Sequence, residues 1–211
     1  MILPKGASLS VSNKNLAVSN KPLRNIPLIL ASASSRRLDL LAQIGLEPDF
    51  VIPAHIDETP TPKELPRQYA ERMAKEKAAK IAQEHPNALI IAADTVVAMG
   101  RRIMPKAENI EDASLCLNKL SGRRHRVYGG ICLIGPGMVI KERMAETVVS
   151  FKRLQKDEID FYLASNEWLG KAGGYAIQGL AASFVRFISG SYSNIVGLSL
   201  YETYNLVKSY D

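Results

Sequence analysis

An acidic residue interrupts the most apolar segment of this chain, ALIIAADTVVAM at residues 88–99. The residues from Leu89 to Ala93 are typical of a strand in a sheet that is covered on both faces. Asp94 follows directly, and the apolar run then continues to Val97. An ionised carboxylate in such surroundings costs several kcal/mol unless it is paired or bound to a metal. Two interpretations stay open: a buried functional acid, or a strand that ends at Ala93 and leaves Asp94 at a surface turn.

The composition is that of a globular enzyme, and most of the excess charge lies at one end. The 211 residues suffice for one large domain or two small ones, and 46% hydrophobic with 23% charged residues is ordinary. Residues 1–26 hold four basic residues and no acid, whereas the remainder holds 23 basic and 21 acidic residues. The body is therefore nearly neutral, and we expect no nucleic-acid partner.

The first 26 residues differ from the rest of the chain. They are rich in Ser and Asn without strong periodicity, so we expect a flexible N-terminal tail over 1–26, with an organelle transit peptide as the alternative. No apolar run approaches the ~20 residues of a membrane span, so we expect no membrane partner. Cys116 and Cys132 fall in an expected helix and an expected strand, which favours reduced packing residues in a cytoplasmic protein.

Strands and helices alternate in the first half, and the second half is richer in strands. Strands are expected at 28–32, 48–54, 88–99 and 183–189, with a long hairpin over 126–154. Helices are expected at 36–44, 66–84, 109–120, 157–165 and 194–208. The pattern predicts an α/β fold with a mixed sheet, because hairpins break the simple alternation.

The sequence LASASSRR at residues 30–37 places serines and two arginines where a strand passes into a helix. Helix N-termini offer free N–H groups and a partial positive charge. The hydroxyls of Ser32 and Ser34 and the forked guanidinium groups of Arg36 and Arg37 suit phosphate oxygens. The segment predicts an anion site; the alternative is that the serines cap the helix while the arginines lie in solvent.

Lys77 lies in the apolar stripe of the expected helix 66–84, in line with Tyr69, Met73 and Ile81. Such a lysine either extends its ammonium group to solvent or reaches an anion in a cleft. Nothing else on this helix decides between the two interpretations.

Acids and a lysine near the apolar strand suggest a cation and phosphate site. Asp57 and Glu58 follow the expected strand 48–54 and could hold a hard divalent cation together with Asp94, although loop acids are usually solvated. Lys106 lies beyond the turn after that strand and could neutralise phosphate charge.

Gln178 lies in the segment GGYAIQG, whose glycines let a backbone or a ligand approach closely. Its amide both donates and accepts, so it can read the edge of a flat base; the alternative is a buried Gln satisfied by backbone groups. The cluster RRHR at 123–126 is either an anion site or a solvated strand edge. No zinc spacing and no Ser-His-Asp set is found in the sequence.

As an ordered set, seven motifs resemble the Maf family of nucleoside triphosphate pyrophosphatases from about residue 27 to 208. They are S-x-S-x-R-R, I-D-E-T, Y-A-x-R-x-A-x-x-K-A, A-A-D-T-V-V, L-S-G-x-x-H-x-V, G-Y-A-I-Q-G and G-S-Y-x-N-x-V-G-L. The resemblance implies a single domain over 27–211 with a Maf/ITPase-like, elongated mixed sheet, helices on both sides and a cleft between two lobes. It also implies a homodimer.

The resemblance assigns roles to individual residues. Asp94 matches the proton acceptor and one acid of the metal site, and Glu58 matches the other acid; the cation would be Mg²⁺ or Mn²⁺. Three basic residues match positions around the triphosphate: Arg37, Lys77 and Lys106. Three further residues match positions tied to substrate choice: Arg36, Thr95 and Gln178.

The segment G-Y-A-I-Q-G is similar to the branch that hydrolyses dTTP and UTP, not the branch acting on methylated guanosine triphosphate. Water would attack the α-phosphorus and release pyrophosphate and a nucleoside monophosphate. The alternative is a nucleotide-binding regulator linked to cell division with little turnover, against which the retained acids and lysines argue. Three departures from the family pattern are Ser35 for proline, Pro105-Lys106-Ala107 for Gly-Lys-Pro, and Gly129-Gly130 for Thr-Gly.

Overall fold

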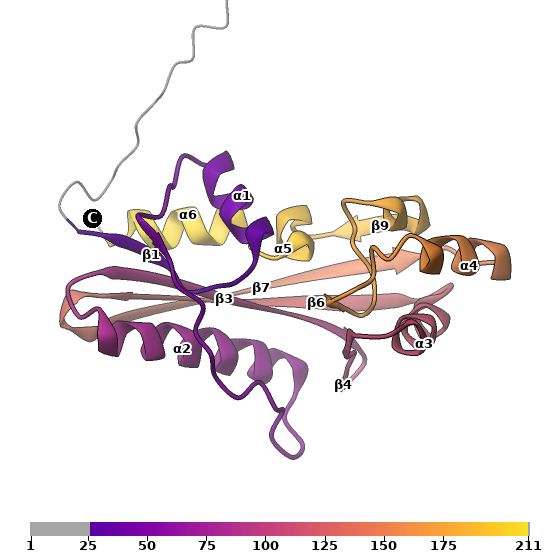
Figure 1. Cartoon of the computed structure of the whole chain (residues 1–211), viewed down its shortest axis with the longest axis horizontal. Helices are drawn as coiled ribbons and strands as arrows, with labels where there is room; N and C mark the ends of the chain where they lie inside the picture. The colour runs from indigo at the N-terminus through magenta and orange to yellow at the C-terminus, as the bar shows by residue number, and fades with distance from the viewer. Residues whose placement is uncertain (1–25, 211) are drawn as a thin grey trace, which may run out of the picture.

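The expected mixed sheet runs through the whole molecule, for which a computed structural model describes residues 26–210 (Figure 1). The expected tail, residues 1–26, lies outside the described residues except for Ile26. Within the described part, six strands follow one another in the order β2-β1-β3-β6-β7-β9, and β4 pairs with β3. The strands are β1 (Leu28–Leu30), β2 (Phe50–Val51), β3 (Leu89–Met99), β4 (Arg102–Ile103), β6 (Arg124–Gly135), β7 (Val139–Phe151) and β9 (Val185–Ser189).

Both strand directions occur in this sheet. The short strand β1 is parallel to both β2 and β3. The pairs β3–β6, β6–β7 and β7–β9 are antiparallel. A second, two-stranded sheet joins β5 (Lys106–Ala107) to β8 (Lys171–Ala172). The expectation of a mixed α/β sheet is confirmed.

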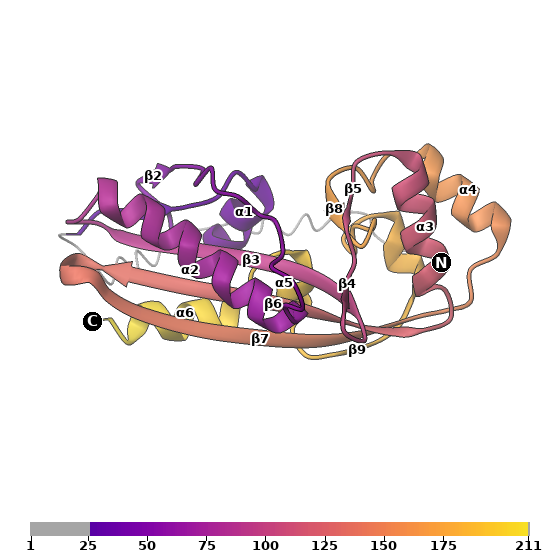
Figure 2. The same ribbon diagram turned by 90° about the horizontal axis from the view of Figure 1, so that it is seen from below.

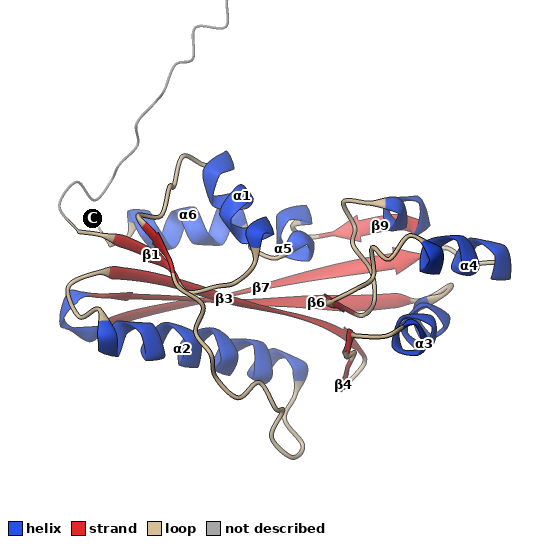
Figure 3. Cartoon of the chain, in the orientation of Figure 1, coloured by secondary structure: helices blue, strands red, loops and turns tan. Residues whose placement is uncertain are grey.

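Helices cover both faces of the main sheet (Figure 3). One long helix, α2 (Pro66–Glu84), packs on one face. Three others cover the opposite face: α1 (Ser35–Gln43), α5 (Tyr192–Val196) and α6 (Leu200–Lys208). None of the helices in residues 26–210 is long and apolar enough to cross a membrane.

The alternation of β3 explains why its sequence is apolar throughout. Leu89, Ile91 and Ala93 belong to the core that β3 shares with α1 and α6. Ile90 and Ala92 belong to the core shared with α2. Because successive strand residues point to opposite faces, both faces of β3 must be apolar to be buried.

A second group of elements packs around the far end of β6 and β7 (Figure 2). It contains the small sheet, α3 (Ile110–Leu120), α4 (Lys156–Ala164) and the 3₁₀ segment η2 (Leu180–Phe184). Its core holds edge-on aromatic pairs, with Phe151 and Tyr175 4.9 Å apart between ring centroids. The two groups form two lobes joined by the long strands.

Three expected elements differ in the structure. The strand expected at 48–54 is only Phe50–Val51, because it pairs with the three-residue strand β1 alone. The helix α4 begins at Lys156, where the Gln155 N–H donates to Glu158 Oε2 (3.0 Å), two residues earlier than an Asp157 cap would place it. The last helix is broken at Gly197, whose φ of 149° cannot continue a helix.

Candidate active site

A cavity of about 520 Å³ opens where β1 ends while β3 continues. Leu30 of β1 is in register with Ile91 of β3, so β3 runs on without that neighbour from Ala92. Side chains from both lobes line the space. The lining includes all the residues expected from the S-x-S-x-R-R motif and from the family resemblance: Ser32, Ser34, Arg36, Arg37, Glu58, Lys77, Asp94, Thr95, Lys106 and Gln178.

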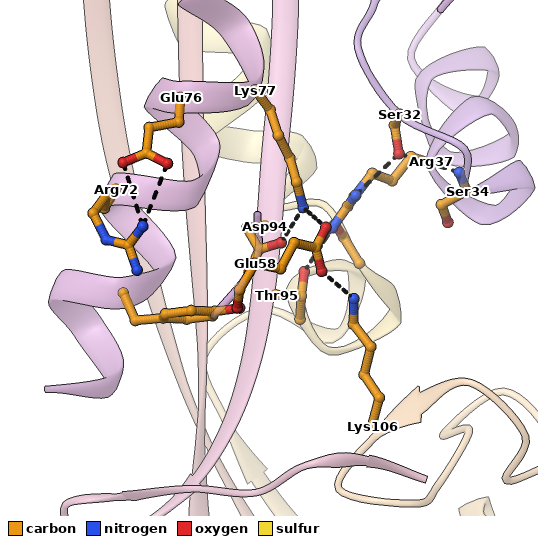
Figure 4. A network of polar contacts seen from close by, with 12 residues as sticks. Ser32, Ser34, Arg37, Glu58, Arg72, Glu76, Lys77, Asp94, Thr95 and Lys106 are labelled. Carbon is orange, nitrogen blue, oxygen red and sulfur yellow. Dashed lines mark hydrogen bonds and ion pairs between the residues drawn. The ribbon is translucent and has the colours of Figure 1, made fainter. Parts of the chain in front are cut away.

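An acid–lysine cluster lines this cavity (Figure 4). Asp94 is 6% exposed and lies within β3, so the alternative of a surface turn is wrong. It points towards α2, where Lys77 Nζ lies 2.6 Å from Asp94 Oδ1 and 2.7 Å from Glu58 Oε1. Lys106 Nζ lies 2.5 Å from the second oxygen, Glu58 Oε2. Lys77 is itself 7% exposed, so it does not extend to solvent.

The charge of Glu58 is fixed by its two lysines. Partial burial raises the pKa of this carboxyl, but hydrogen bonds from Lys106 and Lys77 outweigh burial and lower the pKa to about 2. The loop that carries Glu58 is held by Tyr69 of α2, whose hydroxyl donates to the Glu58 carbonyl oxygen (2.7 Å). Glu58 is therefore an anion at neutral pH with a fixed backbone.

Arg37 is held on the opposite side by neutral oxygens. Its Nε donates to the Gly197 carbonyl oxygen (2.9 Å), Nη1 to Ser32 Oγ (3.0 Å) and Nη2 to Thr95 Oγ1 (3.4 Å). The Thr95 hydroxyl also donates to the Gly197 carbonyl oxygen (3.1 Å). Desolvation by burial lowers the pKa of Arg37, and the charge of Asp94 opposes that shift. A desolvated guanidinium group with neutral partners is suited to binding an anion.

The remaining residues of the S-x-S-x-R-R motif lie beside it. Arg36 Nε donates to the Val196 carbonyl oxygen (3.3 Å), and burial lowers its pKa. The Ser34 N–H donates to Ser32 Oγ (3.1 Å), and Ser34 makes no capping bond through its side chain at the start of α1. The interpretation that the serines serve only as caps and the arginines lie in solvent is therefore wrong.

Other candidates from the sequence lie elsewhere. Asp57 does not line the cavity; its Oδ1 accepts from the Thr59 N–H (2.9 Å) within its own loop. In the part of the chain that the structure describes, no group of three His, Cys, Asp or Glu side chains could hold a metal, so the three-acid set with Asp57 is not formed. Gln178 is exposed at the cavity, not buried among backbone groups.

The RRHR cluster divides between surface and core. Its three arginines are exposed and do not line the cavity, and Arg126 pairs with Glu146 (2.7 Å). His125 is 2% exposed, and its Nε2 lies 2.9 Å from the hydroxyl of Tyr175 in the cavity wall. Desolvation lowers the pKa of His125 to about 4.

Sequence reasoning missed the two backbone carbonyls that orient the arginines. Val196 and Gly197 accept from Arg36 and Arg37 because the expected helix 194–208 breaks there and leaves these oxygens free. The glycine inside that expected helix was the available signal.

The sequence of this chain matches known proteins. The family model described as Maf-like protein matches residues 27–210. The chain belongs to the Maf family. A dTTP/UTP pyrophosphatase of Paramagnetospirillum magneticum is 61% identical over 87% of this chain and 96% of that protein. One of Rhodospirillum rubrum is 60% identical over 84% of each chain. A solved HAM1 protein from Coxiella burnetii is 16% identical, with a TM-score of 0.48 over 88% of this chain and all of that one.

The departure from the Maf pattern at Gly129 has a structural counterpart. A Cβ atom at Gly129 would lie 1.9 Å from Oδ1 of Asn194, which is fully buried. The Asn194 amide donates to the Val127 carbonyl oxygen and to Thr147 Oγ1, both at 3.1 Å. The side chain of Asn194 therefore occupies the space that a threonine side chain at 129 would need.

Proposed function

We propose that this protein is a nucleoside triphosphate pyrophosphatase that hydrolyses dTTP and UTP to the monophosphate and pyrophosphate. The observation that carries the proposal is the buried Asp94, which faces Lys77 in a cavity that two desolvated arginines border. The named activity of relatives about 60% identical supports the same reaction.

The residues divide the work between proton transfer and charge stabilisation. Asp94 accepts a proton from the water that attacks the α-phosphorus, which adds a P–O bond as the bond to the leaving pyrophosphate breaks. Arg37, Lys77 and Lys106 stabilise the charge on the bridging and leaving oxygens, and each well-placed donor contributes roughly 10²–10³ in rate. In the structure Lys77 and Lys106 pair with the carboxylates of Glu58 and Asp94. The phosphates of a bound nucleotide therefore compete with these carboxylates for the two lysines.

The two carboxylates also fit a divalent cation. Glu58 and Asp94 offer hard oxygen donors, and Lys77 Nζ contacts both, so a positive charge is already stabilised between them. Glu58 and Asp94 would hold Mg²⁺ or Mn²⁺. When bound, such an ion supplies a Lewis acid for the phosphoryl oxygens.

Base choice follows from the polar groups at the cavity. Thymine and uracil present an acceptor–donor–acceptor edge, which an amide such as that of Gln178 can match in two neighbouring groups. Cytosine mismatches this edge and leaves buried polar groups unpaired at ~1–3 kcal/mol each. Thr95 and Arg36 complete the pocket, and purines are excluded mainly by size.

We also propose that residues 27–211 form a single domain, because β6 and β7 extend through both lobes. The family resemblance supports a homodimer. Free, buried Cys116 and Cys132 are consistent with a reducing cytoplasmic location.

Turnover against a nucleotide panel tests the proposed function. Purified protein with Mg²⁺ or Mn²⁺ should release pyrophosphate from dTTP and UTP faster than from CTP, ATP or GTP, and EDTA should stop the release. Nucleotide binding without turnover would support the regulator alternative. Hydrolysis of ATP or GTP as fast as dTTP would contradict the base pocket but not the reaction.

A further inference from the structure

The segment that carries Gln178 has no regular secondary structure of its own. It lies between β8, which ends at Ala172, and the 3₁₀ segment that begins at Leu180. A side chain that reads a base needs a fixed backbone, since discrimination is lost if the amide can follow the wrong partner. The contacts that fix this segment therefore bear on base recognition.

Two side chains hold the backbone on either side of Gln178. The Ala176 N–H, two residues before it, donates to the hydroxyl oxygen of Tyr162 (3.0 Å). The Leu180 N–H, two residues after it, donates to Glu167 Oε2 (2.7 Å). Tyr162 is on α4, and Glu167 lies in the turn that follows this helix. One helix and its turn thus anchor both flanks of Gln178.

Gly179, which follows Gln178, leaves the space that the Glu167 carboxylate occupies. A Cβ atom at Gly179 would lie 2.0 Å from Glu167 Oε2 and 2.6 Å from its Cδ. The carboxylate can therefore reach the Leu180 N–H only because residue 179 has no side chain.

The anchors themselves are firmly placed. Tyr162 is fully buried, and its ring meets Phe184 edge-on at 5.4 Å between centroids. The Glu167 N–H donates to Ser165 Oγ (3.2 Å), which fixes the turn after α4. Neither Tyr162 nor Glu167 lines the cavity, so neither is in place to touch a bound nucleotide.

We propose that Glu167 and Tyr162 are positioning residues for base selection. They hold the backbone of Gln178 so that its amide can hydrogen-bond to the edge of a pyrimidine base. This inference rests on the proposed function. Removing either anchor frees the Gln178 backbone, so the protein still binds and hydrolyses nucleotides but discriminates less between UTP and CTP. The KM for UTP rises while kcat stays near that of the wild type.

The test compares kcat/KM for UTP and CTP in Glu167→Ala, Glu167→Gln and Tyr162→Phe. The alanine and phenylalanine variants each lose one hydrogen bond, so the UTP/CTP ratio should fall about three- to tenfold. Glu167→Gln keeps an acceptor oxygen and should stay within about twofold of the wild type. Asp49→Ala is the matched control, because it loses a carboxylate–backbone bond to the Leu28 N–H (2.8 Å) away from both α4 and the cavity.

Thermal unfolding of each variant separates misfolding from lost discrimination, and Tyr162→Phe tests the positioning role if Glu167→Ala is unstable. Gln178→Ala is measured beside them. If Gln178→Ala loses the preference while Glu167→Ala and Tyr162→Phe keep it, the positioning role is overturned alone. A wild-type enzyme with no preference for UTP over CTP would overturn both this role and the proposed base pocket.

Discussion

Replacing Lys77 with methionine separates the charge of this lysine from its packing. Methionine fits the apolar stripe of α2, in which Met73 and Ala74 are also buried. The variant loses an ammonium group that contacts Asp94 at 2.6 Å and Glu58 at 2.7 Å. Glu58 keeps Lys106, whereas Asp94, with its side chain 8% exposed, loses its only ion-pair partner in the described residues.

The expected loss of stability in Lys77→Met follows from the unpaired carboxylate of Asp94. Breaking a buried pair by removing one partner costs about 3–5 kcal/mol, and the adjoining cavity places the effect at the lower end, about 3 kcal/mol. For a chain of this size each kcal/mol shifts Tm by about 2–4 °C, so Lys77→Met should melt about 6–12 °C lower. Activity should fall by at least ~10²-fold, since a phosphate-facing charge is lost.

A double-variant cycle in urea tests the reasoning. Lys77→Met/Asp94→Asn removes both charges, so it should be more stable than Lys77→Met alone. Lys75→Met on the same helix is the control; its surface pair with Glu142 (3.3 Å) predicts a change within about 0.5 kcal/mol. A double variant less stable than the single one would refute the account of an unpaired buried charge.

Three other variants address catalysis, pH and packing. Asp94→Asn should lower kcat at least ~10²-fold with unchanged circular dichroism, and near-normal turnover would exclude Asp94 as the proton acceptor. Burial lowers the His125 pKa from 6.5 to about 4, so the unfolded chain binds more protons in that window. Stability should therefore fall by about 3 kcal/mol as pH drops from 6.5 to 4, and His125→Gln should flatten this slope in urea titrations. Gly129→Ala places a Cβ 1.9 Å from Asn194 Oδ1 and should cost about 1–3 kcal/mol of unfolding free energy; an unchanged urea midpoint would contradict the clash.

Periodicity in the sequence indicated the elements that carry Asp94 and Lys77, but it left open whether either side chain faces solvent. The alternation of β3 puts Asp94 on the same face as Ile90 and Ala92, which pack on α2. The four-residue stripe of α2 puts Lys77 on the face that packs on this strand. The two periods placed both residues on apolar elements, but the contact between Lys77 and Asp94, 17 residues apart, is seen only in the structure.

Contacts between segments far apart in the sequence could not be predicted from the periodicity of apolar residues. The bond between Arg37 and the Gly197 carbonyl oxygen spans 160 residues and depends on a helix break. The anchors of Gln178 come from α4 and from the turn after it, and no sequence spacing encodes their contacts with this segment. The short strand β2 was overestimated, because its length is set by its partner β1 and not by its own apolar residues.

Hydrolysis of UTP in ¹⁸O-labelled water tests the central claim most directly. If water attacks the α-phosphorus beside Asp94, the label enters UMP and the pyrophosphate carries none. Mass spectrometry of both products after a single turnover reports the position of the label. Label in the pyrophosphate, or release of UDP and orthophosphate, would contradict the account.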